Sequence, residues 1–191
     1  MKIVLASKSP RRQELLQIMG LSDFIIDPAT SEEQVQANLS PSETVMAIAA
    51  QKAAEVAKKH DANTLVIAAD TLVYLGNAQL GKPRNENEAA HMLRALSGKS
   101  HKVFTGVSLI LGNRSISDFE ETTVFFRPLS ETEIRSYVSS GEPMDKAGAY
   151  GVQGLGSIFV ERINGDFFNV MGLPICRLYT MLCKLGISIL G

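Results

Sequence analysis

The stretch that decides the fold is LVIAADT, residues 65–71. Its first five residues are apolar, and an unbroken apolar run of this kind is typical of a strand buried on both faces of a sheet. The run ends at the polar residues Asp70 and Thr71. Open α/β sheets carry their sites at the carboxyl ends of such strands, which favours a functional Asp70 over a carboxylate that caps a turn. An aspartate there can bind Mg²⁺ or accept a proton from water.

Helices and strands alternate outward from this strand. Apolar periodicity, proline and glycine positions, and capping boxes at 40–43 and 130–133 mark where the elements begin and end. The expected strands are 3–6, 65–75 with a return toward 80, 103–111, a partner running to 126, and a hairpin of 158–163 with 167–170. The expected helices begin near residues 9, 40, 85, 130 and 174. This order predicts a single α/β domain over residues 1–191 with a mixed sheet.

The composition limits the possible partners. The formal net charge is −1, so no overall positive field attracts a long nucleic acid, and any polyanion must be bound by a local cluster of charges. Apolar runs stay well below the roughly 18 residues of a membrane span, and the apolar start is too short for a signal peptide. We therefore expect a cytoplasmic protein.

The cysteines and histidines indicate neither a disulfide nor a metal site. Cys176 and Cys183 are seven residues apart in one helical pattern, and we expect buried free thiols in a reducing compartment. His60, His91 and His101 share no metal-binding spacing, so each is expected at the surface or at a helix end.

The segment SKSPRR, residues 7–12, is a candidate phosphate site. It joins the first expected strand to the first expected helix, and the N-terminus of a helix offers unpaired N–H groups and a partial positive charge. Arginine guanidiniums bind phosphate oxygens in pairs. The pattern alone leaves a solvated helix start with two surface arginines equally open.

Further features admit both a functional and a plain interpretation. Lys52 lies on the apolar stripe of its helix, so its amine must reach solvent along its stem or point into a cleft. Lys82 follows a turn and Glu33 lies in a polar loop, where solvent exposure is the plain interpretation. Segment 145–156 contains four glycines, which permit positive φ and close approach to a ligand, and its apolar residues favour a packed loop.

Six ordered segments together resemble the Maf family of nucleotide pyrophosphatases. They are ASKSPRR at 6–12, EEQ at 32–34, KA at 52–53, ADT at 69–71, GKP at 81–83 and DKAGAYGVQG at 145–154. The resemblance covers nearly the whole chain. It implies an elongated mixed sheet flanked by helices, with two lobes around a deep cleft, as in inosine triphosphate pyrophosphatases. It also implies cleavage of nucleoside triphosphates between the α and β phosphates, a divalent cation (Mg²⁺ or Mn²⁺), and a homodimer.

The resemblance also implies roles for individual residues. They are Asp70 as proton acceptor, Lys52 and Lys82 as catalytic cations, Ser7, Ser9 and Arg12 as triphosphate ligands, and Glu33 with Asp70 as metal ligands. Cations for phosphate oxygens and carboxylates for a metal are what a metal–triphosphate complex requires.

Base choice is expected to depend on Arg11, Thr71 and Gln153, which match the family branch that acts on dTTP and UTP. The amide of Gln153 offers a donor and an acceptor, which suit the O4 and N3–H edge of thymine or uracil. Three alternatives stay open: the 7-methyl-GTP branch, a pyrophosphatase for modified or other pyrimidine nucleotides, and a nucleotide-binding regulator of septum formation without useful turnover.

Overall fold

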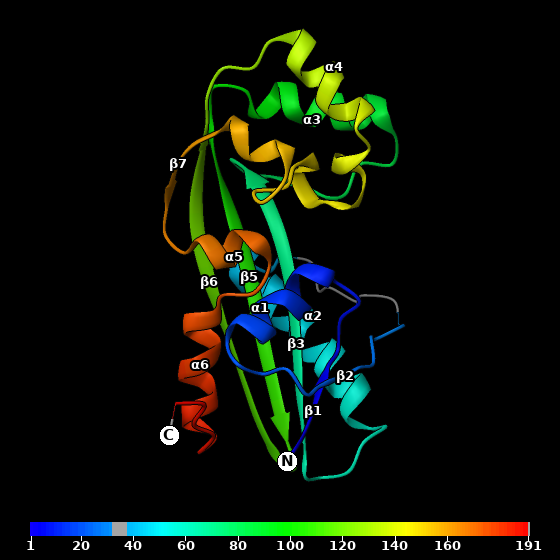
Figure 1. Ribbon diagram of the computed structural model, residues 1–191, viewed down its shortest axis with the longest axis vertical. Coiled ribbons are helices and arrows are strands. Elements are labelled where there is room, and N and C mark those ends of the chain that lie inside the picture. The colour runs from blue at the N-terminus through cyan, green and yellow to red at the C-terminus, as the bar shows by residue number, and fades with distance from the viewer. Residues whose placement is uncertain (32–37, 191) are drawn as a thin grey trace. The chain divides into compact units, whose positions relative to one another are not determined.

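The computed structural model of the chain describes residues 1–31 and 38–190. Its strands form a seven-stranded sheet in the order β2-β1-β3-β5-β6-β7, with β4 paired to β3 (Figure 1). The strands are β1 (Lys2–Leu5), β2 (Ile25–Ile26), β3 (Thr64–Leu75), β4 (Ala78–Leu80), β5 (Ser100–Leu111), β6 (Arg114–Phe126) and β7 (Val160–Asn164). The α-helices are α1 (Pro10–Ile18), α2 (Pro41–Ala57), α3 (Glu86–Leu96), α4 (Glu131–Ser139), α5 (Phe167–Met171) and α6 (Ile175–Lys184), and short 3₁₀ helices span Glu142–Asp145, Ala147–Ala149 and Leu155–Phe159. Parallel and antiparallel pairs occur together, which confirms the predicted mixed α/β sheet flanked by helices.

Two compact units make up the chain. The first unit contains Met1–Thr71, Phe104–Glu120 and Gly172–Gly191. The second unit contains Leu72–Val103 and Glu121–Met171. Strands β3, β5 and β6 therefore contribute residues to both units.

In the first unit, β1 runs parallel to β2 and β3, with Ile3 opposite Leu65. The residues of β3 from 64 to 70 are all buried, as the apolar run predicted. Helix α2 packs Ala53 and Val56 into one apolar cluster with residues of β1 and β3. The apolar stripe predicted for α2 is confirmed, since Val45, Ile48, Ala49, Ala53 and Val56 are each at most 2% exposed.

The start of α2 lies directly against β5. A Cβ on Gly106 would overlap the backbone carbonyl of Val45, and its distance to the amide nitrogen of Met46 would be 2.7 Å. No side chain fits between these two backbones, so β5 requires a glycine at this point of contact.

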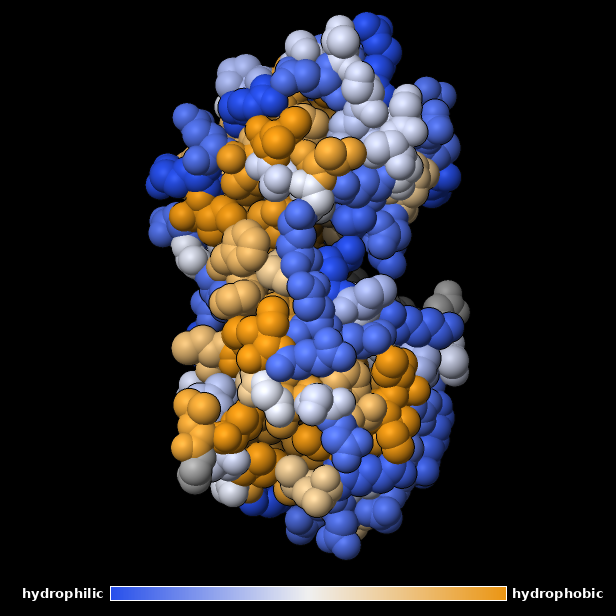
Figure 2. All heavy atoms as spheres, in the orientation of Figure 1, coloured by the Kyte–Doolittle hydropathy of each residue, from blue (hydrophilic) through white to orange (hydrophobic). Residues whose placement is uncertain are grey.

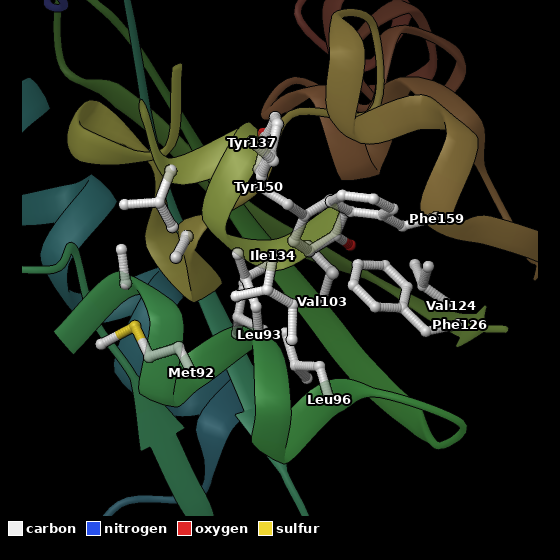
Figure 3. Close-up of a cluster of buried hydrophobic side chains, with 14 residues drawn as sticks. Met92, Leu93, Leu96, Val103, Val124, Phe126, Ile134, Tyr137, Tyr150 and Phe159 are labelled. Carbon is white, nitrogen blue, oxygen red and sulfur yellow. The ribbon is translucent and has the colours of Figure 1, made fainter. Parts of the chain in front are cut away.

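In the second unit, α3 and α4 cover a cluster of buried side chains built around aromatic rings (Figure 3). Phe126, Tyr150 and Phe159 meet edge to face or tilted, with Phe126 and Tyr150 centroids 4.7 Å apart. The capping box predicted for α4 is present, because Ser130 accepts from the Glu133 amide and Glu133 accepts from the Ser130 amide. Capping boxes satisfy backbone donors that a helix start otherwise leaves unpaired.

The hairpin predicted over residues 158–170 is wrong. Only β7 is a strand, paired antiparallel with β6, and residues 167–171 form the short helix α5. The buried amide of Asn169 accounts for the difference, since its Nδ2 donates to the Val103 carbonyl and to Oγ1 of Thr122. A helical turn directs this side chain at both partners and so satisfies the Nδ2 donors inside the core.

The cysteines and one histidine also differ from expectation. Cys176 and Cys183 are free thiols, but both are exposed on α6, because the buried stripe of that helix is formed by Leu178, Met181 and Leu182. His101 is buried on β5 with 2% exposure, on the same face as Val103. The sequence-based strand began at residue 103, so the inward direction of His101 was not foreseen.

No helix in residues 1–31 and 38–190 is both long and apolar enough to cross a membrane. Polar and apolar side chains are interspersed over the face of the molecule drawn in Figure 2. Such mixing is ordinary for a protein surface.

Candidate functional site

The segment from Ser7 to Arg12 links β1 to α1 in the first unit. Ser7 is buried, and its Oγ accepts a hydrogen bond from the backbone amide of Ser9 at 3.2 Å. Pro10 occupies the first turn of α1, as predicted, whereas Ser9 at the N-cap makes no side-chain capping bond. The first turn of α1 therefore begins without a side-chain cap from Ser9.

Arg12 is fixed by three hydrogen bonds within the first unit. Its Nε donates to the carbonyl of Gly172 at 2.8 Å, while Nη1 and Nη2 donate to Oγ of Ser7 and Oγ1 of Thr71, each at 3.1 Å. The Thr71 hydroxyl also lies 2.9 Å from that of Thr105. The guanidinium therefore links the start of α1, the middle of β3 and Gly172 through hydrogen bonds.

The sequence did not indicate Thr105 or Gly172 as parts of this arrangement. Gly172 has a φ of 110°, a left-handed value that favours glycine, and a Cβ there would lie 3.4 Å from Oγ1 of Thr71. Thr105 was assigned to the correct strand, and a buried hydroxyl among apolar neighbours is the one signal that could have drawn attention to it.

Lys52 and Asp70 form an ion pair. Asp70 lies inside β3, which continues to Leu75, so the strand does not end at Asp70 as the end of the apolar run suggested. The Lys52 Nζ lies 2.7 Å from Asp70 Oδ1, with side-chain exposures of 21% and 11%. The position of Lys52 on the apolar stripe left open whether its amine reaches solvent or points inward. In the structure the amine points at the Asp70 carboxylate. The other oxygen, Asp70 Oδ2, is buried and has no hydrogen-bond partner among the described residues. A buried acceptor without a partner is costly, which indicates that a ligand group or water completes the site.

The donor set at Asp70 suits a hard cation that shares its coordination with phosphate. Mg²⁺ is usually bound through one or two carboxylates together with substrate phosphates and water. Within the described part of the chain, no group of three or more His, Cys, Asp and Glu side chains is arranged to hold a metal. The unpartnered Asp70 Oδ2 fits one such bond. Glu33, the second expected metal ligand, lies outside the described residues.

The remaining predicted site residues lie partly in the first unit and partly in the second. Arg11 is half-buried on the first turn of α1, beside Arg12. Lys82 and Gln153 are exposed and belong to the second unit. There the carbonyl of Gly81 accepts from the Gly148 amide at 3.0 Å, so the segment that carries Lys82 is tied to the glycine-rich segment.

Comparison with known proteins finds relatives that match nearly the whole chain. The family described as "Maf-like protein" matches residues 2–185. A dTTP/UTP pyrophosphatase of Bacillus mycoides (strain KBAB4) is 52% identical over 177 residues, covering 93% of this chain and 92% of the relative. Proteins with the same name from Bacillus cereus (strain AH820) and Caldicellulosiruptor bescii are 49% and 48% identical, covering 98% and 99% of this chain and 97% of each relative.

Among solved structures, a HAM1 protein from Coxiella burnetii is similar to this chain with a TM-score of 0.53 and 16% sequence identity. The similarity covers 96% of this chain and 99% of the other. At this level of identity it shows a shared fold and nothing about chemistry.

Proposed function

The chain belongs to the Maf family, and on that premise we propose that it hydrolyses dTTP and UTP to the nucleoside monophosphate and pyrophosphate. Relatives 52% and 49% identical over nearly their full length carry the name dTTP/UTP pyrophosphatase, which supports this substrate choice. The single structural observation that carries the chemistry is the Lys52–Asp70 ion pair with its second carboxylate oxygen unpartnered among the described residues. We treat residues 1–191 as one functional domain, since the family match spans 2–185.

In the proposed reaction Asp70 is the proton acceptor. The Lys52 ammonium orients Oδ1, which leaves Oδ2 to activate the water that attacks the α-phosphate, either by taking its proton directly or through a cation that Oδ2 would bind. A base must lie within hydrogen-bond reach of the proton it removes, and the ion pair with Lys52 holds the Asp70 carboxylate in a fixed position for this role. Lys52 would also stabilise the negative charge that develops on the phosphate.

The triphosphate ligands in the first unit are Ser7, Ser9 and Arg12. Their support is the start of α1, where backbone N–H groups and a fixed guanidinium face the same end of the helix. A preorganised guanidinium loses little side-chain entropy when it binds an anion. Lys82, in the second unit, is assigned as a further phosphate cation on the family resemblance alone.

A divalent cation, Mg²⁺ or Mn²⁺, bound by Asp70 and Glu33 would neutralise charge on the phosphates and help to activate water. Without a cation, Lys52 and Arg12 would meet an excess of phosphate charge, so we expect activity to depend on added metal. Chelation should abolish turnover while the ion pair between Lys52 and Asp70 preserves the local structure.

Base choice is assigned to Arg11, Thr71 and Gln153. The hydroxyl of Thr71 is bonded to Arg12, which would couple this residue to the phosphate ligand as well. Gln153 would pair its amide with the polar edge of thymine or uracil. A site built on such hydrogen bonds rejects mismatched bases strongly, because its own polar groups would otherwise be left unpaired.

We further propose that the enzyme acts in the cytoplasm as a homodimer. The family resemblance is the basis for the homodimer, and the cytoplasmic location follows the expectation from the sequence patterns. The ligand is a nucleoside triphosphate and not a long nucleic acid, in keeping with the formal net charge of −1.

Pyrophosphate release from dTTP, UTP, CTP and 7-methyl-GTP, each with Mg²⁺ or Mn²⁺, tests the proposal. We expect kcat/KM to be highest for dTTP and UTP. Preference for 7-methyl-GTP or CTP would move the chain to another substrate branch. Nucleotide binding without turnover would instead support a regulatory protein.

A further inference from the structure

Glu142 binds three donors around the glycine-rich segment of the second unit. Its Oε2 accepts from the backbone amide of Leu155 at 2.8 Å, and its Oε1 accepts from the Gly156 amide at 3.2 Å and the Tyr137 hydroxyl at 2.9 Å. Burial alone would raise the pKa of Glu142, but these three hydrogen bonds lower it below its ordinary value. The carboxylate is therefore charged at neutral pH, and charge-assisted hydrogen bonds are the stronger kind.

Tyr137 connects Glu142 to Gly151, at the N-terminal end of the same stretch of backbone. Its hydroxyl accepts from the Gly151 amide at 3.1 Å while it donates to Glu142. The ring is 4% exposed and packs edge to face against Phe159 at 4.9 Å, inside the cluster shown in Figure 3. We call Tyr137 and Glu142 the loop clasp, because together they bind the backbone at 151, 155 and 156.

The glycines of the segment are explained by the clasp. A Cβ on Gly154 would overlap the Glu142 carboxylate, and one on Gly156 would lie 2.6 Å from the Tyr137 hydroxyl oxygen. A Cβ on Gly151 would lie 2.7 Å from Cε of Lys146. None of these three glycines has a positive φ. They are required for the close approach of Glu142, Tyr137 and Lys146. The expected positive φ occurs at Gly148, where φ is 72°.

Gln153 lies in the middle of the short stretch whose two ends the clasp holds. Only residues 152–154 separate the bonded amides of Gly151 and Leu155, so the backbone at Gln153 has little room to move. The side chain of Gln153 belongs to an exposed residue. Selection by hydrogen bonds requires the selecting group to be held within a fraction of an ångström of its productive position.

We propose that Glu142 and Tyr137 are positioning residues that fix Gln153 for base selection. The inference rests on the proposed function, because it assigns a role in the choice between bases. A purely structural clasp would predict a different result: its loss would lower stability and affect all nucleotides alike. The two roles therefore predict different changes in the ratio of kcat/KM for dTTP over that for dATP.

The experiment compares wild type with Glu142→Gln and Tyr137→Phe. Glu142→Gln turns one carboxylate oxygen into an amide donor that faces N–H or O–H donors, and Tyr137→Phe removes the hydroxyl but keeps the ring packing. Glu131→Gln is the matched control, since Glu131 is an exposed glutamate of the same unit, ion-paired with Arg94. Gln153→Glu gives the benchmark for direct loss of the selecting amide. For each variant, kcat and KM are measured separately for dTTP, UTP and dATP, together with the thermal midpoint.

We expect both clasp variants to reduce the ratio of kcat/KM for dTTP over dATP by about tenfold, in the direction of Gln153→Glu and mainly through KM. Glu131→Gln should keep the wild-type ratio. An unchanged ratio in both clasp variants, with a lowered thermal midpoint, would overturn the inference. A wild-type protein that releases no pyrophosphate from dTTP or UTP would overturn the proposed function, and with it any role of the clasp in base selection.

Discussion

Acidification should destabilise the fold through one buried histidine, His101 on β5. Its Nε2 lies 2.8 Å from the Tyr150 hydroxyl, and its ring meets Phe126 and Tyr150 edge to face at 5.1 and 5.3 Å. Nδ1 is buried without a hydrogen-bond partner in the described ranges. This burial lowers the pKa of His101 from 6.5 to about 4, because a charged imidazolium has no compensating partner there.

The sign and size of the effect follow from proton linkage. The unfolded chain binds this proton near pH 6.5, whereas the folded chain binds it only near its lowered pKa of about 4. The stabilisation is fully present above pH 6.5 and is lost as the pH falls from 6.5 to about 4. A pKa difference of about 2.5 units corresponds to about 3 kcal/mol of unfolding free energy.

The assay is urea unfolding of wild type and His101→Phe between pH 7 and pH 4. Phenylalanine keeps an aromatic ring beside Phe126 and Tyr150 but cannot bind a proton. Carboxylates titrate in both proteins, so the difference between the two pH profiles isolates His101. Wild type should lose about 3 kcal/mol more than the variant over this range. Parallel profiles would refute the reasoning.

Three further predictions concern the site and its support. Asp70→Asn should lower kcat by about 10²- to 10⁴-fold with the fold intact, measured by pyrophosphate release and circular dichroism, and a near-normal kcat would remove Asp70 as the base. Arg12→Lys should lose the fork that binds Gly172, Ser7 and Thr71 and reduce kcat/KM by about tenfold or more for every nucleoside triphosphate alike, so a loss confined to one base would contradict its phosphate role. Gly106→Ala should cost about 1–3 kcal/mol in urea unfolding because the new Cβ overlaps Val45, whereas Gly81→Ala, whose Cβ would meet nothing within 4 Å, should cost little; equal effects would contradict the packing of α2 on β5.

Local patterns predicted the parts of the fold that local forces determine. The apolar run before Asp70 identified the buried strand β3. The helical periodicity of apolar residues and the capping boxes identified α2 and α4. Helix α5 was missed because it depends on Asn169 meeting Val103 and Thr122, which lie 66 and 47 residues away in the chain. No local pattern carries that information.

The candidate site was likewise predicted only in part from local sequence patterns. The position of Lys52 on an apolar stripe signalled an unusual lysine, but its partner Asp70 is 18 residues away and on another element. The bonds from Arg12 to Thr71 and Gly172 span 59 and 160 residues. Glu142 was overlooked because the sequence-based loop began at Asp145, and an acidic residue at a helix exit resembles ordinary surface.

Isotope labelling in ¹⁸O-water tests the central claim most directly, because it reports which phosphorus atom the water attacks. Wild-type protein is incubated with dTTP and Mg²⁺ in labelled water, and the products are analysed by mass spectrometry. If Asp70 directs water at the α-phosphate, one ¹⁸O atom will appear in dTMP and the pyrophosphate will be unlabelled. Label in pyrophosphate, or dTDP and orthophosphate as products, would contradict the account.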